Sequence, residues 1–482
     1  MIKKRVESLL NLSGVCKLMV FDLAGFEGVY DYIAILKEYG FKIVQYTNVE
    51  SFRLEYEENH KNTTERIATI IKNNIYVPYD IQQKFRKVSL SLEAVFPKLH
   101  TDTLMKYRCD MDLISFAYDN CYADAKTPQD TDDFIRKVAF SEHIINCYCT
   151  SKIELLRHLC EIAGRYTDWI TIARLKTVVH YYATLTNLEM DFTFADEAFA
   201  RFIERGYETL STEIGTNAPT IVTKALRFIS GKGNRKIALI VMDGMSLFDF
   251  EAISRHFTGI EYEFNCTFVI IPTTTPLSRQ SLLSAKFPRE LEKPFSLANE
   301  EKEFVAEASG IGYNNNQIQF LRRYEPVVSQ FAKFITVVIN EVDDIVHGQR
   351  QGRIGMYNDM HTLGKSGKLQ KLIKELAKSG FDVYITSDHG NTPCVGVGGF
   401  RSGVEMQSKS MRMAVLKDFA EKHKLLDKYT TEYSGHYLDK SFKYLVCLPG
   451  VSFDNKGESV MTHGGMTLDE VIVPFVKIKG VV

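Results

Sequence analysis

The chain has 482 residues, of which 45% are hydrophobic and 25% are charged, as in a globular protein of two or three domains. Its 59 lysines and arginines nearly balance its 60 aspartates and glutamates, so no global positive field favours tight, unaided binding to nucleic acid. No apolar run approaches the roughly 20 residues that span a bilayer, and no signal peptide opens the chain, so we expect no membrane partner. Nine scattered cysteines predict reduced thiols and a cytoplasmic protein.

The first 80 residues are predicted to form a small α/β region. Strands are expected at 17–22 and 41–46, and the apolar spacing of residues 29–38 favours a helix between them. Residues 52–72 alternate charged and apolar side chains, which predicts an exposed helix. Asp22 ends the first strand, but it has no glycine fingerprint and no partner acid nearby, so a turn or cap role is favoured over a site.

Residues 81–230 form the second predicted domain, and it is mostly helical. Leucine and isoleucine recur at three-four spacing in residues 151–162 and 169–185. This region carries no motif of its own, so it is a candidate surface for docking a partner. The Ser-Gly-Lys-Gly-Asn stretch at 230–234 is the clearest linker and separates it from a third domain, 231–482.

The third domain is predicted to be an open, mostly parallel sheet with helices on both faces, so the fold class is α/β. Its buried strands are expected at 236–242, 266–271, 333–339, 381–387 and 471–476. Ligands of such sheets bind at the carboxyl ends of the strands. Side chains that follow these strands are therefore the candidates for a site.

Three carboxylates and three histidines are the candidate metal ligands: Asp243, Asp343, His347, Asp388, His389 and His463. Asp343 and His347 are four residues apart, which lets both reach one ion, although a capping Asp and an unrelated His would have the same spacing. Burying the adjacent Asp388 and His389 without a partner would be costly, which favours a metal there. Six mixed ligands exceed the need of one tetrahedral zinc, and two metals are typical of phosphoryl transfer.

Thr275 is the candidate nucleophile. It lies in Pro-Thr-Thr-Thr at a strand-to-helix turn, where free backbone N–H groups favour an anion. Helix capping is the alternative role for a threonine in this position.

The order of these motifs resembles that of the alkaline phosphatase superfamily: Asp-Gly after a strand, then Pro-x-x-Thr, Asp-x-x-x-His, Asp-His-Gly and a late His-Gly. Residues 241–246, 272–284 and 463–474 are similar to the PglZ family within that superfamily. This resemblance covers residues 234–482. The N-terminal half has a looser resemblance to the N-terminal region of PglZ proteins from BREX anti-phage systems.

The resemblance implies two metal ions, zinc or alternatively manganese, and a phosphoester substrate. One ion would be held by Asp243, Thr275, Asp388 and His389, and the other by Asp343, His347 and His463. Thr275 would attack phosphorus and form a covalent intermediate. BREX membership would imply a role in phage defence and protein partners such as a DNA methyltransferase.

Several alternatives stay open. Asp344 could replace Asp343 as a ligand, and Ser246 could replace Thr275 as the nucleophile, although a helix cap suits Ser246 better. Arg279 could hold the substrate phosphate or face solvent.

The favoured function is a two-metal phosphodiesterase or nuclease-like hydrolase acting on a nucleotide or a nucleic acid. A phosphate monoester is usually held by an arginine guanidinium, and the sequence does not identify an arginine in such a position. This favours a diester substrate. A phosphomonoesterase and a structural scaffold in a defence complex are the alternatives.

Overall fold

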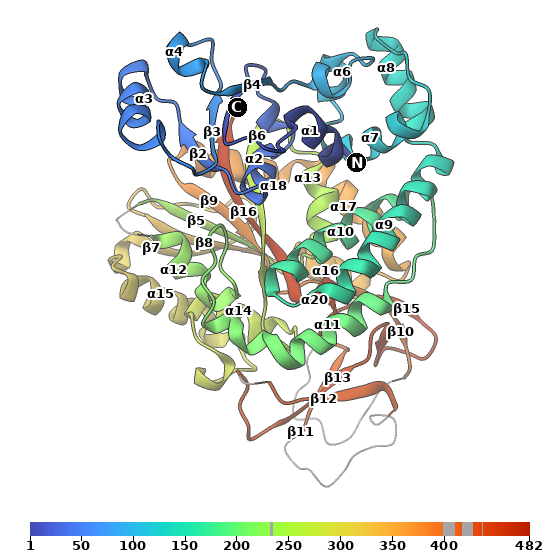
Figure 1. Cartoon of the computed structure of the whole chain (residues 1–482). Helices are drawn as coiled ribbons and strands as arrows, with labels where there is room; N and C mark the ends of the chain where they lie inside the picture. The colour runs from blue at the N-terminus through green and yellow to red at the C-terminus, as the bar shows by residue number, and fades with distance from the viewer. Residues whose placement is uncertain (232–234, 399–409, 417–427, 436) are drawn as a thin grey trace. The chain divides into compact units, whose positions relative to one another are not determined.

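The computed structural model describes residues 1–231, 235–398, 410–416, 428–435 and 437–482, and the chain divides into two compact units, Met1–Tyr148 and Cys149–Val482 (Figure 1). The boundaries expected at 80/81 and 230/231 stay predictions, and linker residues 232–234 lie outside the described ranges. No helix in these ranges is both long and apolar enough to cross a bilayer. All nine cysteines are free thiols.

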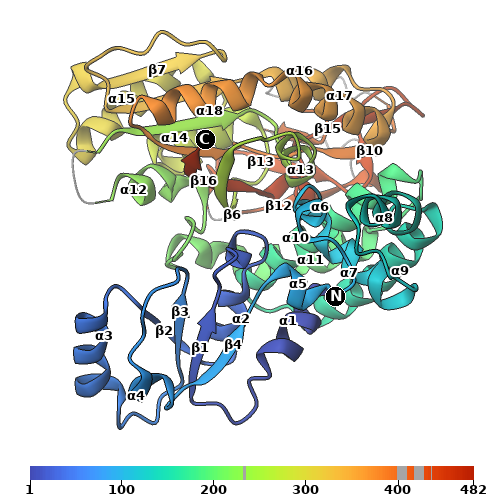
Figure 2. The same cartoon turned by 90° about the horizontal axis from the view of Figure 1, so that it is seen from above.

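The first unit contains a parallel four-stranded sheet. Its strands are β1 (Lys17–Phe21), β2 (Lys42–Gln45), β3 (Ile67–Ile71) and β4 (Arg86–Ser89). They lie side by side in the order β2-β3-β1-β4 (Figure 2). Both strands predicted in this region, β1 and β2, are confirmed.

The helix predicted over 52–72 is wrong in its second half. Helix α3 (Val49–Glu55) and one further helical turn are followed by β3, the strand between β2 and β1. Four of the five residues of β3, Ile-Ala-Thr-Ile-Ile, are buried. β-Branched residues that are covered on both faces suit an inner parallel strand, and this outweighs the charge pattern of the preceding residues.

The other α-helices of the first unit precede, separate or follow these strands along the chain. They are α1 (Ile2–Leu10), α2 (Tyr32–Glu38), α4 (Tyr79–Gln82), α5 (Leu92–Val95), α6 (Thr101–Met105), α7 (Met111–Asn120) and α8 (Pro128–Phe134), and α9 (Glu142–Ile162) contains the boundary between the units. Asp22 has the turn role expected for it. Its carboxylate accepts the backbone N–H groups of Phe26 and Glu27 at 2.5 and 2.9 Å and the hydroxyl of Tyr32 at 3.1 Å.

The second unit is built on a six-stranded sheet. Its strands are β5 (Ile237–Met242), β6 (Ile260–Phe268), β7 (Ile318–Arg322), β8 (Phe334–Ile339), β9 (Asp382–Thr386) and β16 (Ile472–Val481), in the order β6-β16-β9-β5-β8-β7. Strands β9, β5, β8 and β7 are parallel, and β16 runs antiparallel to both its neighbours. The mostly parallel sheet is therefore confirmed, with β7 as a strand that the sequence did not reveal.

Helices cover both faces of this sheet, as expected. Helix α15 (Glu300–Ile311) packs on β7, and α18 (Lys368–Lys378) packs on β9 and β16. The other helices are α10 (Tyr166–Leu185), α11 (Thr193–Gly206), α12 (Ala225–Ser230), α13 (Leu247–Ser254), α14 (Thr275–Ser284), α16 (Glu341–Gly348), α17 (Gly352–Ser366) and α20 (Leu468–Val471). Strands β5 and β8 are buried along their whole length, which explains their unbroken apolar sequence.

Two small sheets belong to the C-terminal part of this unit. One joins β14 (Val451–Ser452), β10 (Thr392–Gly396) and β15 (Ser459–Thr462). The other joins β11 (Met413–Leu416), β13 (Lys443–Cys447) and β12 (Thr430–Tyr433), and both appear in orange and red in Figure 1. Strand β15 leads directly to His463, so one of these sheets positions a candidate ligand.

Candidate metal centre

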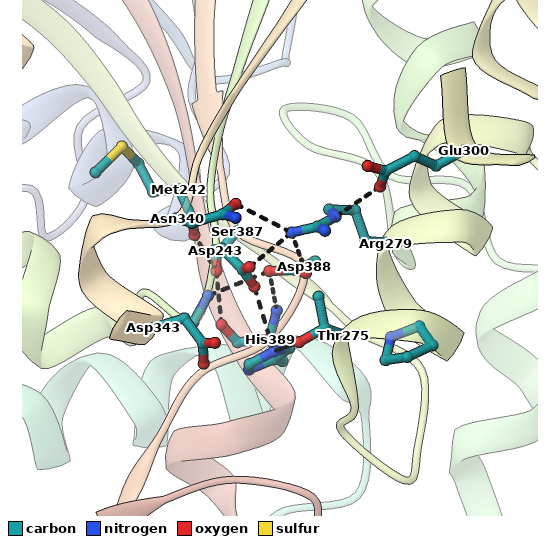
Figure 3. A network of polar contacts seen from close by, with 12 residues as sticks. Met242, Asp243, Thr275, Arg279, Glu300, Asn340, Asp343, Ser387, Asp388 and His389 are labelled. Atoms are coloured by element: carbon teal, nitrogen blue, oxygen red, sulfur yellow. Dashed lines mark hydrogen bonds and ion pairs between the residues drawn. The ribbon is translucent and has the colours of Figure 1, made fainter. Parts of the chain in front are cut away.

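The first group of candidate ligands lies at the carboxyl ends of β5 and β9. Asp243 follows β5, and Asp388 and His389 follow β9 after one serine. The His389 Nε2 atom lies 3.5 Å from Asp243 Oδ1 and 3.0 Å from Thr275 Oγ1, and Figure 3 shows these side chains converging. Asp243, Asp388 and His389 form one group of potential ligand atoms, and the Thr275 hydroxyl adjoins it through His389.

The second group comes from α16 and the loop after β15. His347 Nε2 lies 3.2 Å from Asp343 Oδ2, and His463 Nε2 lies 3.4 Å from Asp343 Oδ1 and 3.4 Å from His347 Nε2. The other ring nitrogen of His463 lies 2.9 Å from the Thr273 carbonyl oxygen, a contact that fixes the ring and leaves Nε2 facing the group.

The two groups are neighbours. The rings of His389 and His463 stack with centroids 4.0 Å apart and an angle of 16° between their planes. Gly244 lies between β5 and the second group with φ of 74°, and a Cβ there would come within 3.2 Å of Asp343. The positive φ and this close contact with Asp343 both favour a glycine at position 244.

Three carboxylate oxygens in these groups are buried and accept no hydrogen bond: Asp243 Oδ1, Asp343 Oδ1 and Asp388 Oδ2. Leaving a buried acceptor without a partner costs on the order of 1–3 kcal/mol, and more for a charged group. Within each group one ligand atom per residue lies within 4.8 Å of the others. Carboxylate and imidazole donors in this arrangement fit one divalent ion per group.

The electrostatics of the groups suit bound cations. Burial raises the pKa of Asp388 to about 6, and burial together with the charge of Asp388 raises the pKa of Asp243. Burial also lowers the pKa of His463 to about 3, so its imidazole stays neutral and keeps a lone pair for an ion. Burial would raise the pKa of Asp343, but the hydrogen bond from His347 and the charges of nearby histidines lower it.

Arg279 does not face solvent, so that alternative is wrong. The residue is 2% exposed, and its Nη1 lies 2.6 Å from Asp243 Oδ2 while its Nε lies 2.8 Å from Glu300 Oε2 (Figure 3). The guanidinium also lies 4.0 Å from Asp388 Oδ2. Among the described residues it is the one arginine or lysine that pairs with either group, and both its edges contact carboxylates.

The two candidate nucleophiles differ in their contacts. Ser246 caps α13: its hydroxyl donates to Asp249 Oδ2 at 2.7 Å and accepts the Asp249 N–H at 3.3 Å. This confirms the cap role expected for Ser246. Thr275 is the first residue of α14, makes no cap, and directs its hydroxyl to His389.

The two adjacent acids Asp343 and Asp344 differ in position. Asp343 is buried and faces His347 and His463, whereas Asp344 is exposed and lies outside both groups. On a helix, residues i and i+4 share a face and residues i and i+1 do not. The four-residue step from Asp343 to His347 was therefore the informative signal.

A buried ion pair supports the loop of His463 and was not foreseen. Glu470 accepts the backbone N–H of Gly465 at 2.8 Å and the hydroxyls of Thr467 and Thr273 at 2.6 and 3.3 Å, and it pairs with Arg412. Neither Glu470 nor Arg412 is exposed. The Thr-x-x-Glu spacing is a capping-box signature that could have revealed part of this arrangement.

Comparison with known proteins supports the assignment of the second unit. Residues 222–478, more than half of the chain, match the family described as the BREX system PglZ alkaline phosphatase-like domain. No curated protein matches the chain.

Three solved structures show a distant similarity to the chain. Murine ectonucleotide pyrophosphatase/phosphodiesterase 5 is 11% identical, with 50% of this chain and 88% of that chain covered and a TM-score of 0.37. The human protein of the same name is 15% identical, with 50% and 87% covered and a TM-score of 0.35. Phosphonoacetate hydrolase from Sinorhizobium meliloti is 13% identical, with 51% and 90% covered and a TM-score of 0.32.

The family assignment does not depend on these distant structures, because the matched domain contains both ligand groups and Thr275. The chain therefore belongs to the PglZ family of alkaline phosphatase-like proteins and is a phosphoester hydrolase.

Proposed function

We propose that the chain is a two-metal phosphodiesterase with nuclease-like chemistry, with zinc as the expected metal and manganese as the alternative. The proposed ligands of the first ion are Asp243, Thr275, Asp388 and His389, and those of the second are Asp343, His347 and His463. The observation that carries this proposal is the set of three buried carboxylate oxygens without hydrogen bonds, divided between two adjacent groups.

Thr275 is the proposed nucleophile. When bound, divalent ions supply positive charge that acidifies a hydroxyl and offsets the charge developing on phosphate oxygens. The Thr275 oxygen then forms a bond to phosphorus as the bond from phosphorus to the leaving oxygen breaks, and the hydroxyl proton passes to solvent. Water subsequently breaks the bond between phosphorus and Thr275, giving a phosphate monoester and restoring the threonine.

The contacts of Arg279 favour a diester over a monoester. A phosphate monoester carries two negative charges, and recognition of its free oxygens calls for an available guanidinium. Arg279 is buried, and its charge is matched by Asp243 and Glu300. It therefore positions the proposed metal ligand Asp243 and is not available to bind a substrate phosphate. A singly charged diester fits a centre of this kind.

The family suggests the biological setting. We propose that the substrate is a nucleotide or a nucleic acid, that the enzyme works in a BREX-type anti-phage system, and that a DNA methyltransferase is among its partners. The nearly neutral chain would then rely on its partners to hold a long nucleic acid.

The test is hydrolysis of bis(para-nitrophenyl) phosphate beside para-nitrophenyl phosphate by full-length protein, stripped of metal and reloaded with Zn²⁺ or Mn²⁺. We expect metal-dependent turnover, with kcat/KM for the diester at least about tenfold higher, equal to about 1.4 kcal/mol of differential transition-state binding. A preference for the monoester would make the protein a phosphatase. Two bound metals without turnover of either ester would favour the scaffold alternative.

A further inference from the structure

A pocket of about 380 Å³ lies at the carboxyl edge of the large sheet, the edge at which Asp243 and Asp388 also follow their strands. It is formed by the ends of β7 and β8, the start of α16 and the start of α18. Its lining residues are Arg322, Arg323, Tyr324, Val338, Ile339, Asn340, Glu341, Asp344 and Lys368. A volume of this size suits part of a small ligand.

The lining carries three cations and two acids, an excess of one positive charge. Lys368 Nζ is 3.0 Å from Glu341 Oε1, and Arg322 pairs with Glu300 outside the lining. Arg323 has neither a hydrogen bond nor an ion pair with any residue that the structure describes. With Lys368 paired to Glu341 and Arg322 to Glu300, the lining charges left without an ion pair among the described residues are those of Arg323 and Asp344, so one guanidinium is available to a ligand.

The backbone of Arg323 has an unusual conformation. Its φ is 74°, in the left-handed region that residues with a Cβ rarely adopt. It directly follows β7, so this turn sets where its exposed side chain leaves the strand. Such conformations persist where the surrounding structure holds them, and they cluster at functional sites.

Side-chain hydrogen bonds link the lining of the pocket to the first ligand group. Glu300 accepts hydrogen bonds from Arg322 in the pocket and, at 2.8 Å, from Arg279, which also contacts Asp243. The side-chain oxygen of Asn340, another lining residue, accepts a weaker hydrogen bond from Arg279 at 3.4 Å. The lining is also adjacent in sequence to the second ligand group, because the lining residue Asp344 directly follows the proposed ligand Asp343.

We propose that this pocket binds a second phosphate of a nucleotide substrate, with Arg323 as its main charged contact. This rests on the proposed function, because the first phosphate would occupy the metal centre. The substrate class would then be esters with two or more phosphates, such as dinucleotides and short oligonucleotides. Simple diesters with one phosphate would leave the pocket without an anion.

Calorimetry on the zinc-loaded, full-length protein tests this with AMP and α,β-methylene ADP, which differ by one phosphonate group and whose bridge resists hydrolysis. We expect the second ligand to bind about fivefold more tightly, near the upper range for a solvent-exposed ion pair. The variant Arg323→Asn should reduce this ratio to about one, because Asn removes the charge and tolerates left-handed backbone. Arg323→Lys should restore part of it.

Arg201→Asn is the matched control, since Arg201 is an exposed arginine of the same unit, on α11, outside the pocket. It should keep the wild-type ratio. Equal affinities in the wild type, failure of both ligands to bind, or an unchanged ratio in Arg323→Asn would each overturn the pocket proposal.

Binding and turnover separate the two proposals. Diester hydrolysis with equal affinities would leave the proposed function standing and remove the phosphate pocket. Tighter binding of α,β-methylene ADP than of AMP, without hydrolysis of any ester, would support the phosphate pocket and remove the proposed function.

Discussion

Replacing Thr275 with alanine is expected to reduce hydrolysis of bis(para-nitrophenyl) phosphate by at least about 10³-fold, the scale of loss when an enzyme loses its nucleophile. The change removes the hydroxyl that lies 3.0 Å from His389 Nε2 and little else. Thr275 is only partly buried and caps no helix, so alanine should leave the fold and at least the second ion in place. Initial rates and thermal unfolding of the zinc-loaded variant measure both effects.

Ser246→Ala provides the control for Thr275→Ala. Its hydroxyl is engaged by Asp249 in the cap of α13, so we expect activity within a few-fold of the wild type and a loss of about 1 kcal/mol in stability. Thr275→Ser should retain activity because it keeps the hydroxyl. Full activity in Thr275→Ala, or inactivity in a folded Ser246→Ala, would remove Thr275 from the mechanism.

The second large effect is the loss of one ion at a time. Asp388→Asn lies in the first group and His463→Ala in the second, so each should reduce bound zinc from two ions to one per chain. Activity should fall further than the roughly 100-fold typical of losing an outer partner of a ligand. Metal analysis of gel-filtered protein gives the stoichiometry.

Asp344→Asn is the matched control for zinc content. Asp344 adjoins Asp343 but is exposed and belongs to neither group, so this variant should still bind two zinc ions. If a single variant released both ions, or if Asp344→Asn released one, the division into two groups would be wrong.

The candidate site could be predicted from sequence because its residues follow buried strands. Asp243 and the pair Asp388 and His389 come after β5 and β9, which are adjacent and parallel, so their side chains had to meet at one edge. The step from Asp343 to His347 placed two more side chains on one helical face.

The ion pairs around the candidate site could not be predicted in the same way. Arg279 and Glu300 lie 21 residues apart on two different helices, and their ion pair depends on how α14 and α15 pack. Arg412 and Glu470 are separated by 58 residues and meet only because β11 and α20 adjoin the same loop. No local spacing encodes such pairs.

The fold of the second unit was easier to predict from sequence than that of the first. The unbroken apolar runs of β5 and β8 identified buried parallel strands, whereas β7, with one buried residue at its start, had no clear period. The charged residues before β3 favoured a helix in the sequence pattern, so this strand was not predicted. Its position as an inner strand follows from its pairing with β1 and β2.

The most direct test of the two-ion centre is anomalous diffraction at the zinc edge from crystals of the zinc-loaded protein. Two anomalous peaks are expected, one beside Asp243, Asp388 and His389 and the other beside Asp343, His347 and His463. A single peak, or zinc bound only outside these two groups, would contradict the two-metal centre on which the proposed phosphodiesterase depends.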